Sequence, residues 1–216
     1  MSKKTLNISI IATVILIITG GLIITAPARN QLNVHRHQMV TSLDNIHDSV
    51  KSQHNQIPAL IKNSSSDKDD QAAIKMTISK SEKSYQKQMT LYDKRDTSLA
   101  NKVDVVRKAQ RNNNEMINMI IEKYHISLLN DSSKQLKTLH KDYNISKTNQ
   151  NKFNKAVNSY NKAKHTAMGS LVADLRPNKY SDIQKYKTVS PKLLLPFVLT
   201  DYQDRKSTRL NSSHQI

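Results

Sequence analysis

The sequence predicts an all-α protein: a single N-terminal transmembrane helix followed by an antiparallel up-and-down bundle of three or four long helices. The first observation behind this prediction is an apolar run that carries no charged residue from 5 to 27. The second is that apolar residues recur at alternating steps of four and three along the rest of the chain, the spacing of packed helices. The third is the scarcity of turn residues, because 3 Gly and 5 Pro in 216 residues are too few for a sandwich or barrel.

The apolar run is the first element. A membrane-spanning helix needs about 20 mostly apolar residues, and residues 6–26 supply them. We therefore expect residues 1–29 to anchor the chain in a lipid bilayer. The alternative is a cleaved signal peptide, since Ala26-Pro27-Ala28 resembles a cleavage site. The run exceeds the ~7–15 residues of a signal peptide's apolar core, which favours the anchor.

The charges that flank the run bear on its orientation. Lys3, Lys4 and the terminal amine precede it, whereas Arg29 and Arg36 are the basic residues that follow closely. By the positive-inside rule this difference favours a cytoplasmic N-terminus. We therefore expect a single-pass protein of the cell membrane with an extracytoplasmic soluble domain. So small a difference leaves the opposite orientation open.

The first bundle helix is expected along an apolar seam with one polar member, Gln53. The seam consists of Met39, Leu43, Ile46, Val50, Gln53, Ile57 and Leu60. Because Pro58 lacks a backbone donor and clashes with the preceding turn, we expect a break near residues 55–57. Residues 63–70 show no periodicity and are expected to form a loop, in which Asp69 or Asp70 caps the next helix.

A second helical stretch covers residues 71–125. One face of it carries Ile74, Ile78, Tyr85, Met89 and Tyr92, and the continuation carries Leu99, Val103, Val106, Ile117, Ile120 and Tyr124. Polar residues at 93–98 and at 111–114 are candidate interruptions. The pattern therefore leaves open whether this stretch is one helix or two.

The third stretch has the longest regular spacing. Its seam consists of Leu136, Leu139, Tyr143, Ser146, Gln150, Phe153, Val157, Tyr160, Lys164, Ala167 and Leu171. We expect one helix over residues 132–171, and Arg176-Pro177 to end the helical pattern. Residues 176–203 form a basic tail whose apolar run, 193–199, packs on the bundle or touches lipid. Residues 204–216 include an eleven-residue match to a translated sequencing adapter, and we interpret them as an artefact.

Composition excludes most catalytic machinery. The chain has no Cys, and only Gly169 lies outside the apolar run, so thiolate sites, phosphate loops and nucleophile elbows are excluded. Two histidine pairs, His35 with His37 and His47 with His54, lack a third ligand at metal-binding spacing. Asp44 and Asp48 share a helix face, and we expect them to be solvated. We therefore expect a protein that is not an enzyme and has no metal or cofactor.

Three segments resemble the LemA family. Gln56-Ile57-Pro58-Ala59-Leu60-Ile61 is similar to the family's Leu-Ile-Pro-Asn-Leu-Val, and Glu122-Lys123-Tyr124 to its Glu-Asn-Tyr. Phe153 to Asn161 resembles Tyr-Asn-x-Ala-Val-x-x-Tyr-Asn. The matching positions are Ile57, Pro58, Leu60, Tyr124, Phe153, Asn154, Ala156, Val157, Tyr160 and Asn161.

The resemblance implies a single membrane helix, a LemA-like bundle over residues 30–175 and no established biochemical activity. Several positions depart from the family pattern. Residues 52–56 are uncharged where the family usually carries Arg and an acid, His125 replaces a Pro, and Met168-Gly169 replaces Phe-Pro. A binding role that depends on the missing charges is therefore not implied for this chain.

Basic charge is the strongest functional signal. The chain has 34 Lys and Arg against 17 Asp and Glu, a net charge of +17, which indicates acidic surroundings. The candidate polyanion-binding residues are Lys134, Lys137, Lys141, Lys152, Lys155 and Lys162. We expect an envelope interaction or scaffold protein that meets anionic lipid, an anionic wall polymer or another envelope protein. The alternative is a cytoplasm-facing binder of nucleic acid or another polyanion, which the absence of Arg from this stretch disfavours.

Overall fold

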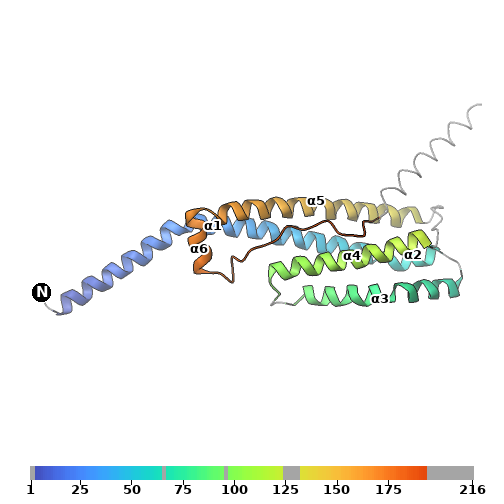
Figure 1. Cartoon of the computed structure of the whole chain (residues 1–216), viewed down its shortest axis with the longest axis horizontal. Helices are drawn as coiled ribbons and strands as arrows, with labels where there is room; N and C mark the ends of the chain where they lie inside the picture. The colour runs from blue at the N-terminus through green and yellow to red at the C-terminus, as the bar shows by residue number, and fades with distance from the viewer. Residues whose placement is uncertain (1–2, 65–66, 95–96, 124–131, 194–216) are drawn as a thin grey trace, which may run out of the picture.

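The computed structural model describes residues 3–64, 67–94, 97–123 and 132–193, with side chains from residue 19 onward except at 22, 64, 123, 132 and 133. Every regular element within these residues is a helix, which confirms the all-α prediction. The helices are α1 (Lys3–His54), α2 (Ile57–Ser64), α3 (Lys68–Tyr92), α4 (Leu99–Lys123), α5 (Ser132–Lys164) and α6 (Ala167–Leu175). The long helices form a bundle in which α1 and α4 run opposite to α3 and α5 (Figure 1).

Helix α1 is the longest element. Its C-terminal half packs mainly along α5, and its N-terminal part extends beyond the end of the bundle (Figure 1). The seam expected from Met39 to Leu60 is buried throughout, and Gln53, its polar member, is fully buried. The helical spacing therefore identifies the core-facing side correctly.

The expected membrane segment, residues 6–26, belongs to the N-terminal part of α1. Its side chains up to residue 18, and at residue 22, lie outside the described residues. Among the residues that are described, no helix is long and apolar enough to cross a membrane. The backbone of α1 continues as one helix through Pro27.

The break expected from Pro58 is confirmed, because α1 ends at His54 and α2 begins at Ile57. Pro58 then occupies the first turn of α2, where a missing backbone donor costs little. The expected cap is wrong. Asp67 is the N-cap of α3, and its carboxylate accepts a hydrogen bond from the backbone N–H of Asp69 at 2.8 Å. Asp69 and Asp70 lie in the first turn of α3, where the positive end of the helix dipole stabilises negative charge.

The stretch from 71 to 125 contains two helices, and the break falls between Tyr92 and Leu99. The asparagines at 112–114 do not interrupt α4, because each finds a partner across the bundle. Asn112 donates to Ser84 Oγ at 2.8 Å, and Asn114 donates to the carbonyl of Pro191 at 3.2 Å. Asn113 lies at 3.4 Å from both the Val50 carbonyl and Gln53 Oε1. Tyr124 lies outside the described residues.

The single helix expected over residues 132–171 is wrong at its C-terminal end. Helix α5 stops at Lys164, and Thr166 caps α6 by accepting a hydrogen bond from the backbone N–H of Gly169 at 3.1 Å. Leu171, expected on the seam, is 48% exposed. The heptad spacing continues past the turn, so spacing alone conceals the corner between α5 and α6.

Residues 176–193, here named the return segment, run back along the bundle after α6. Figure 1 shows the segment following α5 and α4 without forming a helix. Its buried residues are Tyr180, Ile183, Tyr186, Val189 and Leu193. The first four are spaced by three, which matches the three residues per turn of an extended polyproline-like chain. A search for helical periodicity does not detect this pattern.

Asn154 of α5 is the main anchor of the return segment. Its Nδ2 donates to the Tyr186 carbonyl at 3.0 Å, and its Oδ1 accepts from the Tyr186 N–H at 2.7 Å. Phe153 meets the Tyr186 ring edge to face at 6.4 Å, and Tyr160 donates to the carbonyl of Ser181 at 3.2 Å. The third LemA-like segment is thus the part of α5 that holds the return segment.

Candidate polyanion-binding surface

The six candidate lysines are exposed along α5. At 3.6 residues per turn they fall within about a quarter of the helix circumference, on the side opposite the buried seam. From Lys134 to Lys162 they extend over about 42 Å at 1.5 Å per residue. We call these six residues the lysine face.

The lysine face carries no compensating acid. Within the part of the chain that the structure describes, none of its six members forms an ion pair. The one acidic residue of α5, Asp142, is buried at 7% exposure. The positive potential of the face is therefore directed into solvent, where it attracts anions.

A polar groove lies between α1 and α5 beside this face. It has a volume of about 510 Å³ and is lined by His37, Gln38, Thr41, Ser42, Asn45, Asn149, Lys152, Lys155, Ala156 and Ser159. Between the two walls Asn45 Nδ2 donates to Asn149 Oδ1 at 3.4 Å, which is long for a hydrogen bond. Hydroxyls, amides and two lysines thus converge on one open groove. Sequence reasoning missed it because its two walls are more than 100 residues apart along the chain.

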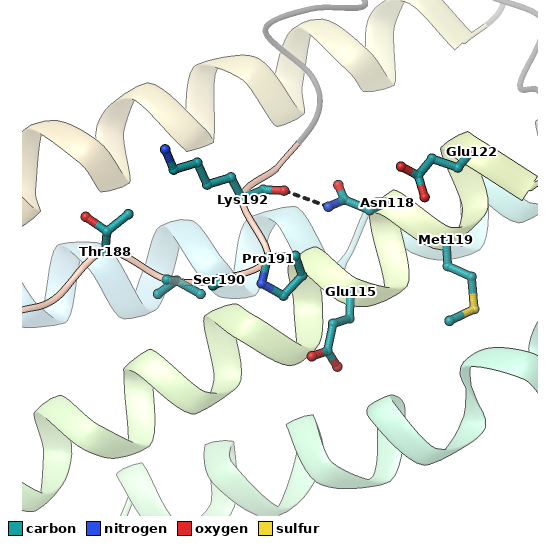
Figure 2. Close-up of a pocket in the computed structure, with 9 residues that line it drawn as sticks. Glu115, Asn118, Met119, Glu122, Thr188, Ser190, Pro191 and Lys192 are labelled. Carbon is teal, nitrogen blue, oxygen red and sulfur yellow. Dashed lines mark hydrogen bonds between the residues drawn. The ribbon is translucent and has the colours of Figure 1, made fainter.

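A larger cavity, of about 940 Å³, lies between α4 and the return segment (Figure 2). Glu115, Asn118, Met119 and Glu122 of α4 line one side, and residues 188–192 line the other. The Asn118 amide donates to the backbone carbonyl of Lys192 at 2.6 Å (Figure 2). Two carboxylates make this cavity unsuited to an anionic ligand.

Of the histidines and aspartates noted in the sequence, His47, Asp44 and Asp48 form contacts beside Tyr92, and both aspartates remain exposed as expected. His47 stacks on Tyr92 with ring centroids 4.1 Å apart, and the Tyr92 hydroxyl donates to Asp44 at 2.5 Å. Burial is the main cause that raises the pKa of Tyr92. Asp48 lies 3.2 Å from His47 Nδ1. Across the described residues no three His, Asp or Glu side chains are grouped to hold a metal ion.

His54 repeats this arrangement seven residues later. It stacks on Tyr85 with ring centroids 3.8 Å apart, and its Nε2 lies 3.3 Å from Glu82. Burial lowers the pKa of His54 from its ordinary value of 6.5, although the charge of Glu82 acts in the opposite direction. The stacked pairs place α1 opposite α3 through aromatic rings.

Folding stability is expected to fall as the pH drops below about 6.5. The unfolded chain then binds a proton at His54 that the folded chain resists, so this residue contributes at most about 1.4 kcal/mol per pH unit. Urea unfolding at pH 7.5, 6.5 and 5.5 measures how steeply the free energy of unfolding changes with pH. His54→Gln is expected to reduce this slope. An equal slope in the His54 variant and the unmodified protein would contradict this assignment.

The LemA-like positions are mainly structural. Ile57 and Leu60 are buried in the core, as are Phe153, Ala156, Val157 and Tyr160. Pro58 is exposed in the first turn of α2, Asn161 is half-buried, and Asn154 holds the return segment. None of these positions lines the groove except Ala156.

No protein-family model, no curated protein and no solved structure matches this chain.

Proposed function

We propose that this chain is a membrane-anchored helical-bundle protein of LemA type that acts as a non-catalytic binding protein of the cell envelope. The lysine face of α5 is its contact surface for an anionic wall polymer. The observation that carries the proposal is the single uncompensated row of lysines along α5. The uncharged run from 5 to 27 supports the membrane anchor. The three LemA-like segments support the assignment to the LemA type.

The length of the lysine face favours a polymer over a lipid surface. Helix α1 is one continuous helix that bends where it enters the bundle, and α5 lies antiparallel beside its bundle part (Figure 1). The Asn45–Asn149 hydrogen bond fixes which residues lie level. It places Lys155 and Lys152 roughly 20 and 24 Å beyond residue 26, at 1.5 Å per residue.

Measured along the helix, these distances exceed the reach of a charged bilayer. The head-group layer adds about 5–8 Å on each side of the hydrocarbon core, and charges are screened over about 8 Å at physiological salt. Of the six lysines, Lys162 lies nearest to the proposed anchor along the helix. A polymer that extends away from the membrane can contact the whole face.

The cytoplasm-facing alternative would use the same lysines on nucleic-acid phosphates. It lacks two features that nucleic-acid surfaces usually have. There is no Arg on α5, and Phe153 and Tyr160 are buried rather than available for base stacking. This alternative is therefore kept as an outcome of the experiments.

Binding of the full chain in lipid nanodiscs to poly(glycerol phosphate) tests the proposal. We expect saturable binding that weakens steeply between 50 and about 300 mM salt. Replacement of all six lysines of the face by Gln should weaken binding about tenfold or more. The matched control replaces six lysines on or beside α3, all exposed, and should have a small effect: Lys68, Lys75, Lys80, Lys83, Lys87 and Lys94.

Two outcomes would contradict the proposal. If the two variants with six lysines replaced lose the same amount of binding affinity, net charge governs binding and the lysine face does not. A reporter fusion that places the bundle in the cytoplasm would remove access to a wall polymer and favour the nucleic-acid alternative.

A further inference from the structure

We infer that the α1–α5 groove is a specific subsite for one repeating unit of a phosphodiester polymer whose backbone carries free hydroxyls, a polyol or sugar phosphate. This inference rests on the proposed function and names the ligand class and the place where it is recognised. The groove has a volume of about 510 Å³, which is enough for a unit of that size.

The cationic part of the groove is Lys152 and Lys155. These residues belong both to the lysine face and to the groove wall. They lie three positions apart on α5, so their side chains leave the same side of the helix about one turn apart. No Asp or Glu lines the groove. A phosphodiester held between the two ammonium groups therefore meets no opposing charge.

The rest of the groove has the chemistry that recognises hydroxyls. Thr41 and Ser159 present exposed hydroxyls from opposite walls, and Gln38 adds an exposed amide. Each such group both donates and accepts, as the hydroxyl of a polyol or sugar does. Asn45, whose side chain is exposed beside Asn149, adds a further amide to this lining.

A nucleic acid also carries phosphodiesters and hydroxyls, but its bases need a different lining. Base recognition uses aromatic platforms or Arg. The groove offers one ring, the imidazole of His37, and no Arg. The lining thus favours a ligand whose units are small and hydroxylated, and RNA is retained as a test ligand.

Two matched lysine pairs separate the groove from the rest of the lysine face. Lys152→Gln with Lys155→Gln removes two charges inside the groove, and Lys134→Gln with Lys137→Gln removes two outside it with the same spacing. The full chain in nanodiscs is titrated with poly(glycerol phosphate). We expect about a tenfold weakening for the groove pair and about twofold for the outer pair.

A second variant removes hydroxyls without changing charge. Thr41→Val with Ser159→Ala is expected to weaken binding of poly(glycerol phosphate) about fivefold and to leave binding of inorganic polyphosphate unchanged. Thr90→Val with Thr148→Val, at exposed positions outside the groove, is the matched control. Circular dichroism and the urea midpoint verify that each variant is folded.

The outcomes separate a failure of the groove as a subsite from a failure of the proposed function. Equal effects of the two lysine pairs, or equal loss of both polymers in the hydroxyl variant, would overturn the groove and leave the lysine face as an unspecific contact. Binding of single-stranded RNA more tightly than poly(glycerol phosphate) would overturn the ligand class. If the unmodified protein binds none of these polyanions, the proposed function fails as well.

Discussion

Replacing Tyr186 with Ala is expected to lower the free energy of unfolding by about 3–5 kcal/mol, the usual cost of deleting a large buried aromatic. Tyr186 is 3% exposed, at the centre of the return segment, and its ring meets Phe153 edge to face. The substitution leaves a cavity between the return segment and α5. It also removes the ring contact that supplements the two backbone hydrogen bonds to Asn154.

The Tyr186 hydroxyl adds a smaller, separable contribution. It donates to Gln110 Oε1 at 2.8 Å, and Gln110 in turn donates to Ser146 Oγ at 3.2 Å. Burial raises the pKa of Tyr186, so the hydroxyl keeps its proton at any physiological pH. Tyr186→Phe should therefore cost about 1 kcal/mol, because Gln150 Nε2 still lies 3.4 Å from Gln110 Oε1.

Urea unfolding of the full chain in detergent, followed by circular dichroism, measures both variants. The difference between their free energies of unfolding gives the contribution of the ring separately from that of the hydroxyl. If Tyr186→Ala costs no more than Tyr186→Phe, the return segment does not contribute its ring to the core.

Gly169→Ala is the second substitution with a large expected effect. In an ordinary helix this change is stabilising by up to about 1 kcal/mol. Here the added Cβ would overlap the carbonyl oxygen of Ala163 and lie 2.9 Å from Thr166 Oγ1. Because the first of these is backbone, α6 must move, and we expect a loss of about 3 kcal/mol.

The control for this variant lies one residue away. Ser170→Ala changes an exposed position of the same helix and should alter stability by less than about 0.5 kcal/mol. Hydrogen exchange of the α6 amides is expected to accelerate in Gly169→Ala only. A stabilised Gly169→Ala protein would show that the corner between α5 and α6 is not fixed by this close approach.

The bundle helices and the break at Pro58 were predictable from local patterns, but the cap of α3 and the corner between α5 and α6 were not. The seam from Met39 to Leu60 and the break near Pro58 follow from helix geometry and from the missing donor of proline. The cap at Asp67 and the corner at Thr166 depend on which of several adjacent polar residues reaches a free backbone N–H. Continuity of α4 through Asn113 depends on partners more than 50 residues away, which no local window contains.

The candidate site divides in the same way. The lysines of α5 are visible as a one-signed helix face, so their exposure could be predicted. The groove could not, since Thr41 and Ser159 come together only when α1 and α5 pack. The path of the return segment could not be predicted, because a spacing of three residues matches neither the helical nor the strand period. Its apolar residues are nevertheless visible in the sequence.

The return segment also makes completion of the fold depend on residues that are synthesised after the bundle helices. The Tyr180 hydroxyl donates to Asn33 Oδ1 at 2.9 Å, across 147 positions of the chain. A ribosome releases the first helices many seconds before the residues that cover α4 and α5. Until then the polar interior around Gln110 and Asn154 lacks its last partners. The helices of the nascent chain therefore pack before the return segment can cover them, and this covering step joins parts of the chain that are far apart in sequence.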